Sequence, residues 1–179
     1  AIAPKPTLLL LDEPFSNLDL HLRERLAHDL RHLLKSQNMT ALMVTHDQQE
    51  AFAFADKIGV MHQGKIEQWG SADSIYRQPQ TDYVANFIGD GAVLTQIQAK
   101  SLKLPANNAG IYLLRPEHLK LAEDSNLSAK IISVHPQGHS TLLRGICQVE
   151  ADTPIKLMLR CDANQKIQVG EAVNFSLAL

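Results

Sequence analysis

The chain has 179 residues, of which 45% are hydrophobic and 20% are charged, so it is long enough for one domain or two small ones with a buried core. Its net charge of -2 and aromatic content of 5% argue against a nucleic-acid-binding protein, which is typically basic and carries aromatic side chains for stacking. Two cysteines are too few for a disulfide scaffold, and no apolar run approaches the roughly 20 residues that cross a bilayer.

The first half of the chain alternates between strand and helix patterns. A short apolar run over residues 8–11 predicts a strand buried on both faces, and leucines at helical spacing over residues 20–34 predict a helix. A second apolar run, 40–45, predicts another strand. Asp47, followed by Glu50, predicts a capping box at the start of the next helix. This order predicts a parallel sheet with crossover helices.

The next segment predicts a hairpin and two short helices. Strand-like residues 58–61 and 65–69 flank Gln63 and Gly64, which favour a tight turn. Helices are expected over residues 71–77 and 81–88, with Gly89 as the stop signal of the second.

Beyond residue 89 the apolar segments are short and separated by turn residues, which predicts a small antiparallel barrel or sandwich. The sequence therefore predicts two domains, an α/β domain over residues 1–89 and a small all-β domain over 90–179. The strands expected in the second domain cover residues 92–97, 111–114, 119–121, 129–134, 140–146, 155–159 and 172–177.

Two carboxylates close the first strand. Asp12 and Glu13 lie where a parallel sheet holds its ligands, at the carboxyl end of a strand. Asp12 is suited to Mg²⁺, which prefers oxygen ligands, and Glu13 could orient or deprotonate a water that attacks a γ-phosphate. The alternative is a pair of solvated carboxylates with no chemical role.

Three further polar residues belong to the same predicted edge. His46 follows the second strand, so it could donate a hydrogen bond to a γ-phosphate, or it could be an ordinary structural histidine. Ser16 and Asp19 lie in a polar loop after the carboxylates. Asp19 could reach a partner subunit, and it also suits the N-cap of the following helix.

The segment LLLLDEPFSNLD at residues 8–19, followed by VTHDQQEAFAFADKIG from residue 44, resembles the second half of an ABC transporter ATPase subunit, with its Walker B strand, D-loop and H-loop. The resemblance implies a P-loop NTPase fold that uses ATP and Mg²⁺. It implies that Asp12 supports the metal, Glu13 is the catalytic base and His46 contacts the γ-phosphate. Ser16 and Asp19 would lie in the D-loop that couples the two sites of a homodimer.

The Walker A, Q-loop and LSGGQ-type motifs of that family do not occur in this sequence. Residues 59–65, GVMHQGK, fit the Walker A pattern, but Ile66 replaces the required Ser or Thr, and the segment lies in the predicted hairpin. The missing motifs lie upstream in whole subunits of the family. We therefore expect a C-terminal fragment of an ATPase that is itself inactive.

The C-terminal half of the chain narrows the resemblance to one type of ABC ATPase, that of importers. LLRPEHLKL at 113–121 and AKIISVHPQGHSTLLRG at 129–145 resemble the OB-like TOBE regulatory domain of importer ATPases. YVANFIGDGAVL at 83–94 favours the ferric-iron type, with polyamine, sulfate and maltose importers as alternatives. The implied partners are a second ATPase subunit, transmembrane permease subunits and, indirectly, a periplasmic solute-binding protein. The implied location is cytoplasmic, on the inner face of the membrane.

Other classes of function stay open. The second domain could be a regulatory or dimerisation module that senses a small effector, and an OB-like barrel could bind oligonucleotides, although the charge argues against nucleic acid. Two groups of histidines could suggest metal binding, but separated histidines are commonly solvated. They are His21, His28 and His32 on the first helix, and His118, His135 and His139 in the second domain.

Overall fold

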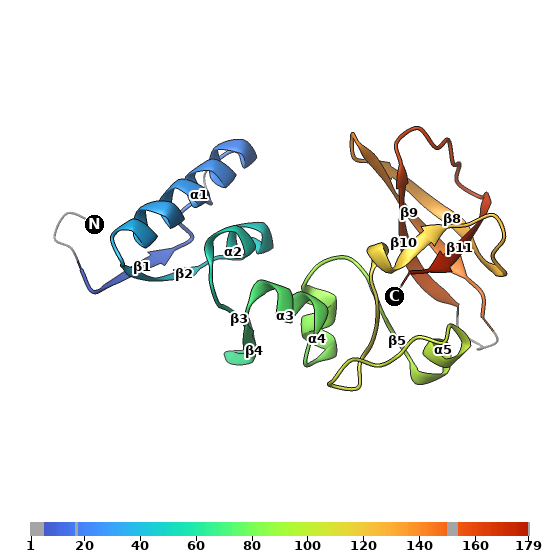
Figure 1. The fold of residues 1–179 in the computed structure, drawn as a ribbon, viewed down its shortest axis with the longest axis horizontal. Helices are drawn as coiled ribbons and strands as arrows, with labels where there is room; N and C mark the ends of the chain where they lie inside the picture. The colour runs from blue at the N-terminus through green and yellow to red at the C-terminus, as the bar shows by residue number, and fades with distance from the viewer. Residues whose placement is uncertain (1–5, 17, 150–153, 179) are drawn as a thin grey trace. The chain divides into compact units, whose positions relative to one another are not determined.

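The computed structural model describes residues 6–16, 18–149 and 154–178 (Figure 1). The chain forms two compact units, Ala1–Ile75 and Tyr76–Leu179. The packing units therefore divide earlier in the chain than residue 89, where the sequence predicts the family boundary. Residues 76–89 pack with the second unit, and the functional boundary at residue 89 stays a prediction.

The first unit contains the parallel pair of strands that the sequence predicts. Strand β1 pairs in parallel with β2, in a register that places Leu8 opposite Thr40 and Asp12 opposite Val44. Helix α1 makes the crossover between the strands and lies along them in Figure 1. The bounds of these elements are β1 Leu8–Asp12, α1 Leu20–Ser36, β2 Thr40–Val44 and α2 Gln48–Phe54.

The β1–β2 sheet is covered on one face only. Leu9 of β1, Leu34 of α1 and Phe54 of α2 are buried against one another, and Met43 packs against them. The opposite face is solvent-exposed within the described residues, so the predicted burial on both faces is wrong for this chain by itself. That face, which we call the open sheet face, consists of Leu8, Leu10, Leu42 and Val44.

The predicted hairpin is confirmed. Strands β3 (Ile58–His62) and β4 (Lys65–Gly70) pair antiparallel, and Gln63 and Gly64 form the turn with φ of 49° and 75°. Residues 59–65 thus run from one strand into its hairpin partner. This placement does not fit a phosphate loop, which connects a strand to a helix.

Short helices and a small hairpin open the second unit. Helix α3 (Ala72–Arg77) spans the division between the units, and α4 (Asp82–Phe87) follows. Strand β5 (Ala92–Leu94) pairs with β6 (Tyr112–Leu114). The strand predicted over residues 92–97 is too long, because Thr95 forms a capping box with Gln98 and starts a helix, α5 (Gln96–Ser101).

A five-stranded antiparallel sheet completes the second unit, in the order β10-β9-β8-β11-β7. Its outermost strands, β7 and β10, also contact each other, so the sheet curls into a nearly closed barrel, as the sequence predicts (Figure 1). Phe175, Leu143 and Ile131 lie at the centre of the core. The bounds are η1 Pro116–His118, β7 Leu119–Leu121, β8 Leu127–Pro136, β9 Ser140–Cys147, β10 Ile155–Asp162 and β11 Ala172–Leu177.

Candidate functional site

The carboxyl ends of β1 and β2 lie side by side, as expected for parallel neighbours. The backbone N–H of Glu13 donates to the carbonyl of Val44 at 2.8 Å, which extends the strand pairing by one residue. The residues that follow the two strands therefore emerge at the same edge of the sheet.

Glu13 has an unusual backbone conformation. Its φ is 43°, in the left-handed region that costs a residue with a side chain about 1–2 kcal/mol. The carbonyl of Glu13 accepts hydrogen bonds from the backbone N–H and the hydroxyl of Ser16, at 3.3 and 3.0 Å. These bonds hold a tight turn immediately after β1.

The turn brings Glu13 to His46. His46 Nδ1 lies 3.0 Å from Glu13 Oε1, and the two side chains are 73% and 47% exposed. The contact joins residues 33 positions apart in the sequence and lies at the sheet edge where the sequence places a reacting centre. The exposed ring and carboxylate leave room for a ligand at the same edge. Their catalytic roles remain predictions.

Asp12 is the last residue of β1, and its side chain is exposed. No group of three or more metal-ligating side chains occurs among the described residues. Mg²⁺ in nucleotide sites, however, is typically held by one or two carboxylates together with phosphate oxygens and water. An exposed aspartate at a parallel strand end, next to a second carboxylate, fits that requirement.

Asp19 caps α1. Its Oδ1 accepts the backbone N–H of Leu22 at 3.0 Å, which confirms the N-cap role that the sequence suggests. The hydroxyl of Ser16 is engaged in the turn after β1. Residue 17, between them in the predicted D-loop, lies outside the described residues, and contact with a partner subunit stays a prediction.

An ion-pair network that the sequence does not predict joins helix α1 to the residues that follow His46. From α1, the Arg23 guanidinium donates to Asp47 Oδ2 at 2.7 Å and to the carbonyl of Leu18 at 3.1 Å. Its Nε lies 3.3 Å from Glu50 Oε1, a close ion pair without the alignment of a hydrogen bond. The sequence carries no local signal for this network, because Arg23 and Asp47 are 24 positions apart.

Glu50 does not complete the predicted capping box of α2. It is only 4% exposed, and its Oε2 accepts the hydroxyl of Thr45 at 2.6 Å. The same hydroxyl accepts the backbone N–H of Asp47 at 3.0 Å. The inward turn of Glu50 is explained by Arg23, because a buried carboxylate needs a paired cation.

The N-cap of α2 itself is confirmed. Asp47 accepts the backbone N–H groups of Gln49 and Glu50 at 2.8 and 3.2 Å. Partial burial alone would raise the pKa of Asp47, but these two backbone donors and the Arg23 guanidinium outweigh it and hold the pKa below its ordinary value.

Arg115 organises the beginning of the second unit. Its side chain is almost fully buried and donates to the carbonyls of Gly89, Asp90 and Tyr76, at 3.1, 2.9 and 3.3 Å. It also lies over the ring of Tyr76, 4.4 Å from the centroid. Arg115 therefore fastens residues 76–90 to the β6 end, and its role within LLRPEHLKL is structural.

A cavity of about 270 Å³ lies beside Arg115 within the second unit. Tyr76, Glu117 and His118 supply polar groups, and Leu104 and Ile111 supply apolar walls. Burial, together with a hydrogen bond to Glu117, raises the pKa of Tyr76 to about 12. The cavity therefore has both polar and apolar walls.

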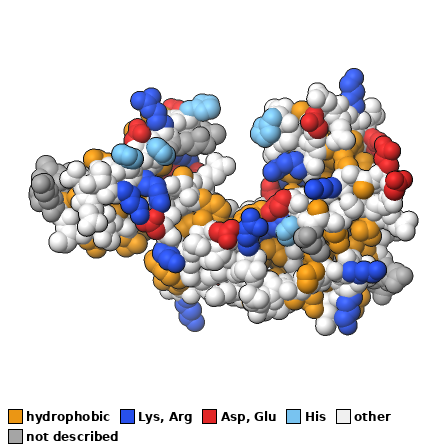
Figure 2. Space-filling model, viewed as in Figure 1, with side chains coloured by type: hydrophobic (Ala, Val, Ile, Leu, Met, Phe, Trp, Pro, Cys, Tyr) orange, Lys and Arg blue, Asp and Glu red, His pale blue; other side chains and the backbone are white. Residues whose placement is uncertain are grey.

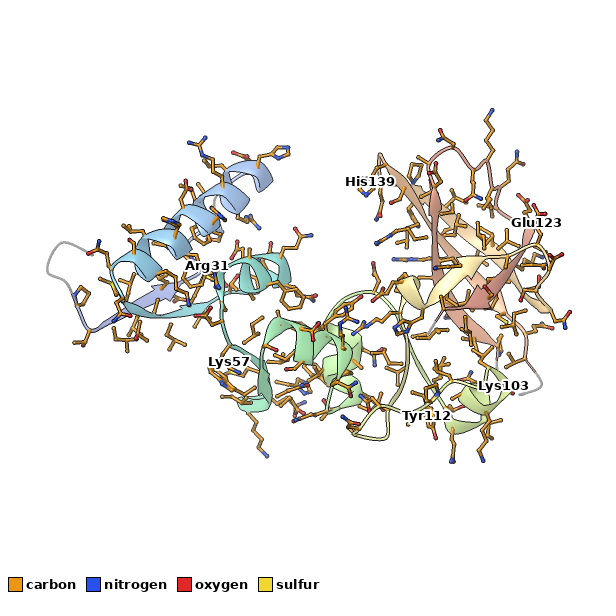
Figure 3. The ribbon with its side chains drawn as sticks, viewed as in Figure 1. Arg31, Lys57, Lys103, Tyr112, Glu123 and His139 are labelled. Carbon is orange, nitrogen blue, oxygen red and sulfur yellow. The ribbon has the colours of Figure 1, made fainter. Side chains whose placement is uncertain are left out.

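Among the described residues, the histidines outside the candidate site do not form a group of three or more metal-ligating side chains. Figure 2 shows histidine and basic side chains gathered over α1, where His21, His28 and His32 are exposed. Figure 3 places His139 at the tip of the β8–β9 hairpin, whereas His118 Nδ1 accepts the backbone N–H of Arg115 at 3.2 Å.

Comparison with known proteins supports the class of protein that the motifs and fold indicate, the ATP-binding subunits of ABC importers. Residues 112–178 match the family model of the TOBE domain. Most of the chain is similar to ATP-binding proteins of ABC transporters. The uncharacterized ABC transporter ATP-binding protein YdcT of Escherichia coli is 39% identical, over 79% of this chain and 42% of the relative.

Two further relatives carry substrates in their names. The spermidine/putrescine import ATP-binding protein PotA of Ruegeria pomeroyi is 41% identical, over 74% of this chain and 42% of the relative. The Fe(3+) ions import ATP-binding protein FbpC of Photorhabdus laumondii is 38% identical, over 75% and 42%. The chain spans less than half the length of these relatives, and their nearly equal similarity does not select one solute. Within the described residues, no helix is both long and apolar enough to cross a membrane.

Proposed function

We propose that residues 1–89 carry the hydrolysis half of an ABC-type ATPase site and that residues 90–179 form its TOBE regulatory domain, in a subunit that energises solute import. The observation that carries this proposal is the contact between Glu13 and His46 at the carboxyl ends of two parallel strands. It supports a reacting centre built from residues far apart in the sequence.

In this proposal Glu13 is the general base. Its carboxylate takes a proton from the water that attacks the γ-phosphate of ATP, and His46 orients the carboxylate through the 3.0 Å contact. The largely exposed His46 ring also contacts the γ-phosphate. Bound Mg²⁺ would neutralise phosphate charge, and Asp12 would hold it from the adjacent position.

The phosphate-binding motifs complete the site from residues that this sequence does not contain. Without a Walker A loop, nothing clamps the β- and γ-phosphates, and positioning supplies most of the catalysis of phosphoryl transfer. We expect purified protein of this sequence to show no turnover of MgATP above background.

The proposal is tested with a chimera that joins the upstream part of the FbpC relative to residues 1–179 of this chain. The chimera should hydrolyse MgATP, and substitution of Glu13 should abolish turnover. A folded chimera that binds ATP but does not hydrolyse it, with the native residues at positions 12, 13 and 46, would contradict the proposal.

We infer that the imported solute is ferric iron, with polyamine as the alternative. Resemblance of residues 83–94 supports iron, and relatives named for Fe(3+) and for spermidine/putrescine support either. The proposed partners are a second copy of the subunit, which Ser16 and Asp19 would face, and membrane permease subunits that hold the ATPase at the cytoplasmic face. Uptake of labelled iron and labelled spermidine distinguishes the solutes when this chimera is compared with one built from the upstream part of the PotA relative.

A regulatory module without hydrolysis is the second candidate. The cavity beside Tyr76 and Glu117 favours it, because a pocket with both polar and apolar walls suits a small effector. This candidate predicts that the second unit binds its ligand whether or not Glu13 is intact, whereas the hydrolysis proposal requires Glu13.

A further inference from the structure

Arg23 lies between two segments that have different roles in the proposed function, the loop after β1 and the loop after β2. It lies in the first turn of α1, directly after the 16–19 segment, and its Nη2 donates to the carbonyl of Leu18. Its Nη1 simultaneously donates to Asp47, directly after His46. One side chain therefore contacts the segment after β1 and the segment after β2.

The histidine loop, which we define as residues 45–47, is held from both sides by this network. Thr45 donates to Glu50 and accepts from the backbone N–H of Asp47. Asp47 caps α2 and binds Arg23, and Glu50 pairs with the same arginine. His46, between Thr45 and Asp47, contacts Glu13 on its outer side.

The geometry requires an arginine. The guanidinium presents several donors in a rigid plane, so it contacts a carbonyl and two carboxylates at once. The Arg23 side chain is 20% exposed and that of Glu50 is 3% exposed, so water screens these charges less than at an open surface. A lysine carries its donors on one nitrogen and lacks this planar spread, so it does not reproduce the arrangement of the guanidinium.

We propose that Arg23 is a positioning residue that couples residues 18–19 to the histidine loop. Its functional meaning rests on the proposed ATPase: the γ-phosphate contact of His46 on one subunit would be transmitted through Arg23 to the segment that faces the second copy. The coupling itself is a property of this chain and needs no nucleotide.

A purely stabilising role is the competing explanation, and Arg31 provides a matched control. Arg31 holds the other end of α2 from the same helix: it donates to the carbonyl of Phe54 and lies 2.7 Å from Asp56 (Figure 3). Arg31→Gln should destabilise the packing of α1 on α2 without breaking any contact to Leu18 or Asp47.

The experiment measures amide hydrogen exchange by NMR in a double-mutant cycle. Thr45→Val removes the hydroxyl within the histidine loop and keeps the shape of the side chain. In a chain with Arg23, Thr45→Val should speed exchange of the Leu18 and Leu22 amides by about fivefold or more, the lower range of coupling between sites. In the Arg23→Gln background it should leave those two amides unchanged.

The controls separate coupling from stability. In the Arg31→Gln background the effect of Thr45→Val on Leu18 and Leu22 should persist, and Arg23→Lys should reduce it to less than half. Fluorescence of Trp69, the only tryptophan in the sequence, checks that the first unit stays folded. If Arg23→Gln unfolds that unit, Arg23→Lys takes its place in the cycle, and the expected result there is an effect of Thr45→Val reduced to less than half.

Three results would overturn the proposal: an equal effect of Thr45→Val with and without Arg23, no effect in the unsubstituted chain, or loss of the effect in the Arg31→Gln background. None of these results bears on whether Glu13 and His46 serve hydrolysis, because the cycle uses no ATP. Conversely, an inactive chimera would leave the measured coupling intact.

Discussion

At the scale of single residues, the candidate site combines backbone strain with exposure. Glu13 adopts φ of 43° although it is not glycine, and the carboxylate that this conformation directs toward His46 remains half exposed. A left-handed backbone conformation costs free energy by itself, and the hydrogen bonds from Ser16 to the carbonyl of Glu13 hold it in place.

Comparison of Glu13→Gly with Glu13→Ala measures this strain. Both variants lose the contact with His46, but glycine accepts a left-handed backbone and alanine does not. The glycine variant should therefore be more stable than the alanine variant by about 1 kcal/mol. Urea unfolding followed by Trp69 fluorescence reports the first unit, and equal stabilities would show that the turn relaxes when the carboxylate is removed.

The sequence predicts the approach of Asp12, Glu13 and His46 because parallel strands place their carboxyl ends at one edge. It does not predict the network of Arg23, because side-chain partners 24 or more positions away depend on how α1 packs over α2. For the same reason the sequence does not predict that Glu50 is buried. The local pattern favours a capping box at the start of α2, but the side chain of Glu50 instead forms an ion pair with Arg23.

At the scale of elements, the start of α2 depends on one carboxylate. Asp47 satisfies two backbone donors and an arginine, and its pKa is held below the ordinary value of 3.8. A carboxyl group whose pKa is lower in the folded state stabilises the fold above its unfolded pKa. This contribution is lost as the pH falls through the folded-state pKa.

Asp47→Ala should lower the free energy of unfolding of the first unit by about 1–2 kcal/mol at pH 7. The difference from the unsubstituted chain should shrink as the pH falls below about 4, because the protonated carboxyl group loses its charge interaction with Arg23. Urea titrations at several pH values check this. A difference that is constant from pH 7 to pH 2 would mean that neutral hydrogen bonding alone makes the cap.

The contact of Tyr76 with η1 gives an alkaline prediction for the second unit. Burial, aided by the hydrogen bond to Glu117, raises the pKa of Tyr76 to about 12, so the stability that this phenol contributes is present below its ordinary pKa of 10.0 and is lost between 10 and 12. Glu117→Gln should lower the pKa of Tyr76, because it removes the negative charge. NMR titration of the tyrosine ring carbons measures the pKa of Tyr76 in both proteins. A pKa that does not change on substitution would mean that burial alone raises it.

Element prediction succeeded where periodicity and turn chemistry agree and failed at one junction. Gln63 and Gly64 form the expected turn, and β1 and β2 pair as expected. The sequence analysis does not predict helix α5, because the apolar run 92–97 continues past Thr95 and resembles a strand. The capping pattern of Thr95 and Gln98 is the signal that distinguishes a helix from a strand there.

At the scale of the whole molecule, the two compact units differ in how completely each one buries its own apolar side chains. The first unit leaves the open sheet face uncovered in this chain, whereas the second encloses a large core drawn from residues 94–175. Arg115 ties residues 76–90 into the second unit as well, so that unit contains its own connections.

Residues 76–179 should therefore fold without the first unit. A chain of these residues should give a dispersed amide NMR spectrum in which core residues such as Leu143 and Phe175 keep the chemical shifts that they have in the full chain. Collapse of the spectrum to random-coil shifts would show that the second unit depends on contacts from residues 1–75.

The central claim is that Glu13, held by His46, is the base of an ATPase site. The most direct test is MgATP turnover by the chimera with Glu13→Gln, beside Asp29→Asn as a control on the exposed surface of α1. If Glu13 is the base, Glu13→Gln should lower kcat by about 100-fold or more with ATP affinity retained, while Asp29→Asn should have no effect. Turnover that is unchanged by Glu13→Gln would contradict it.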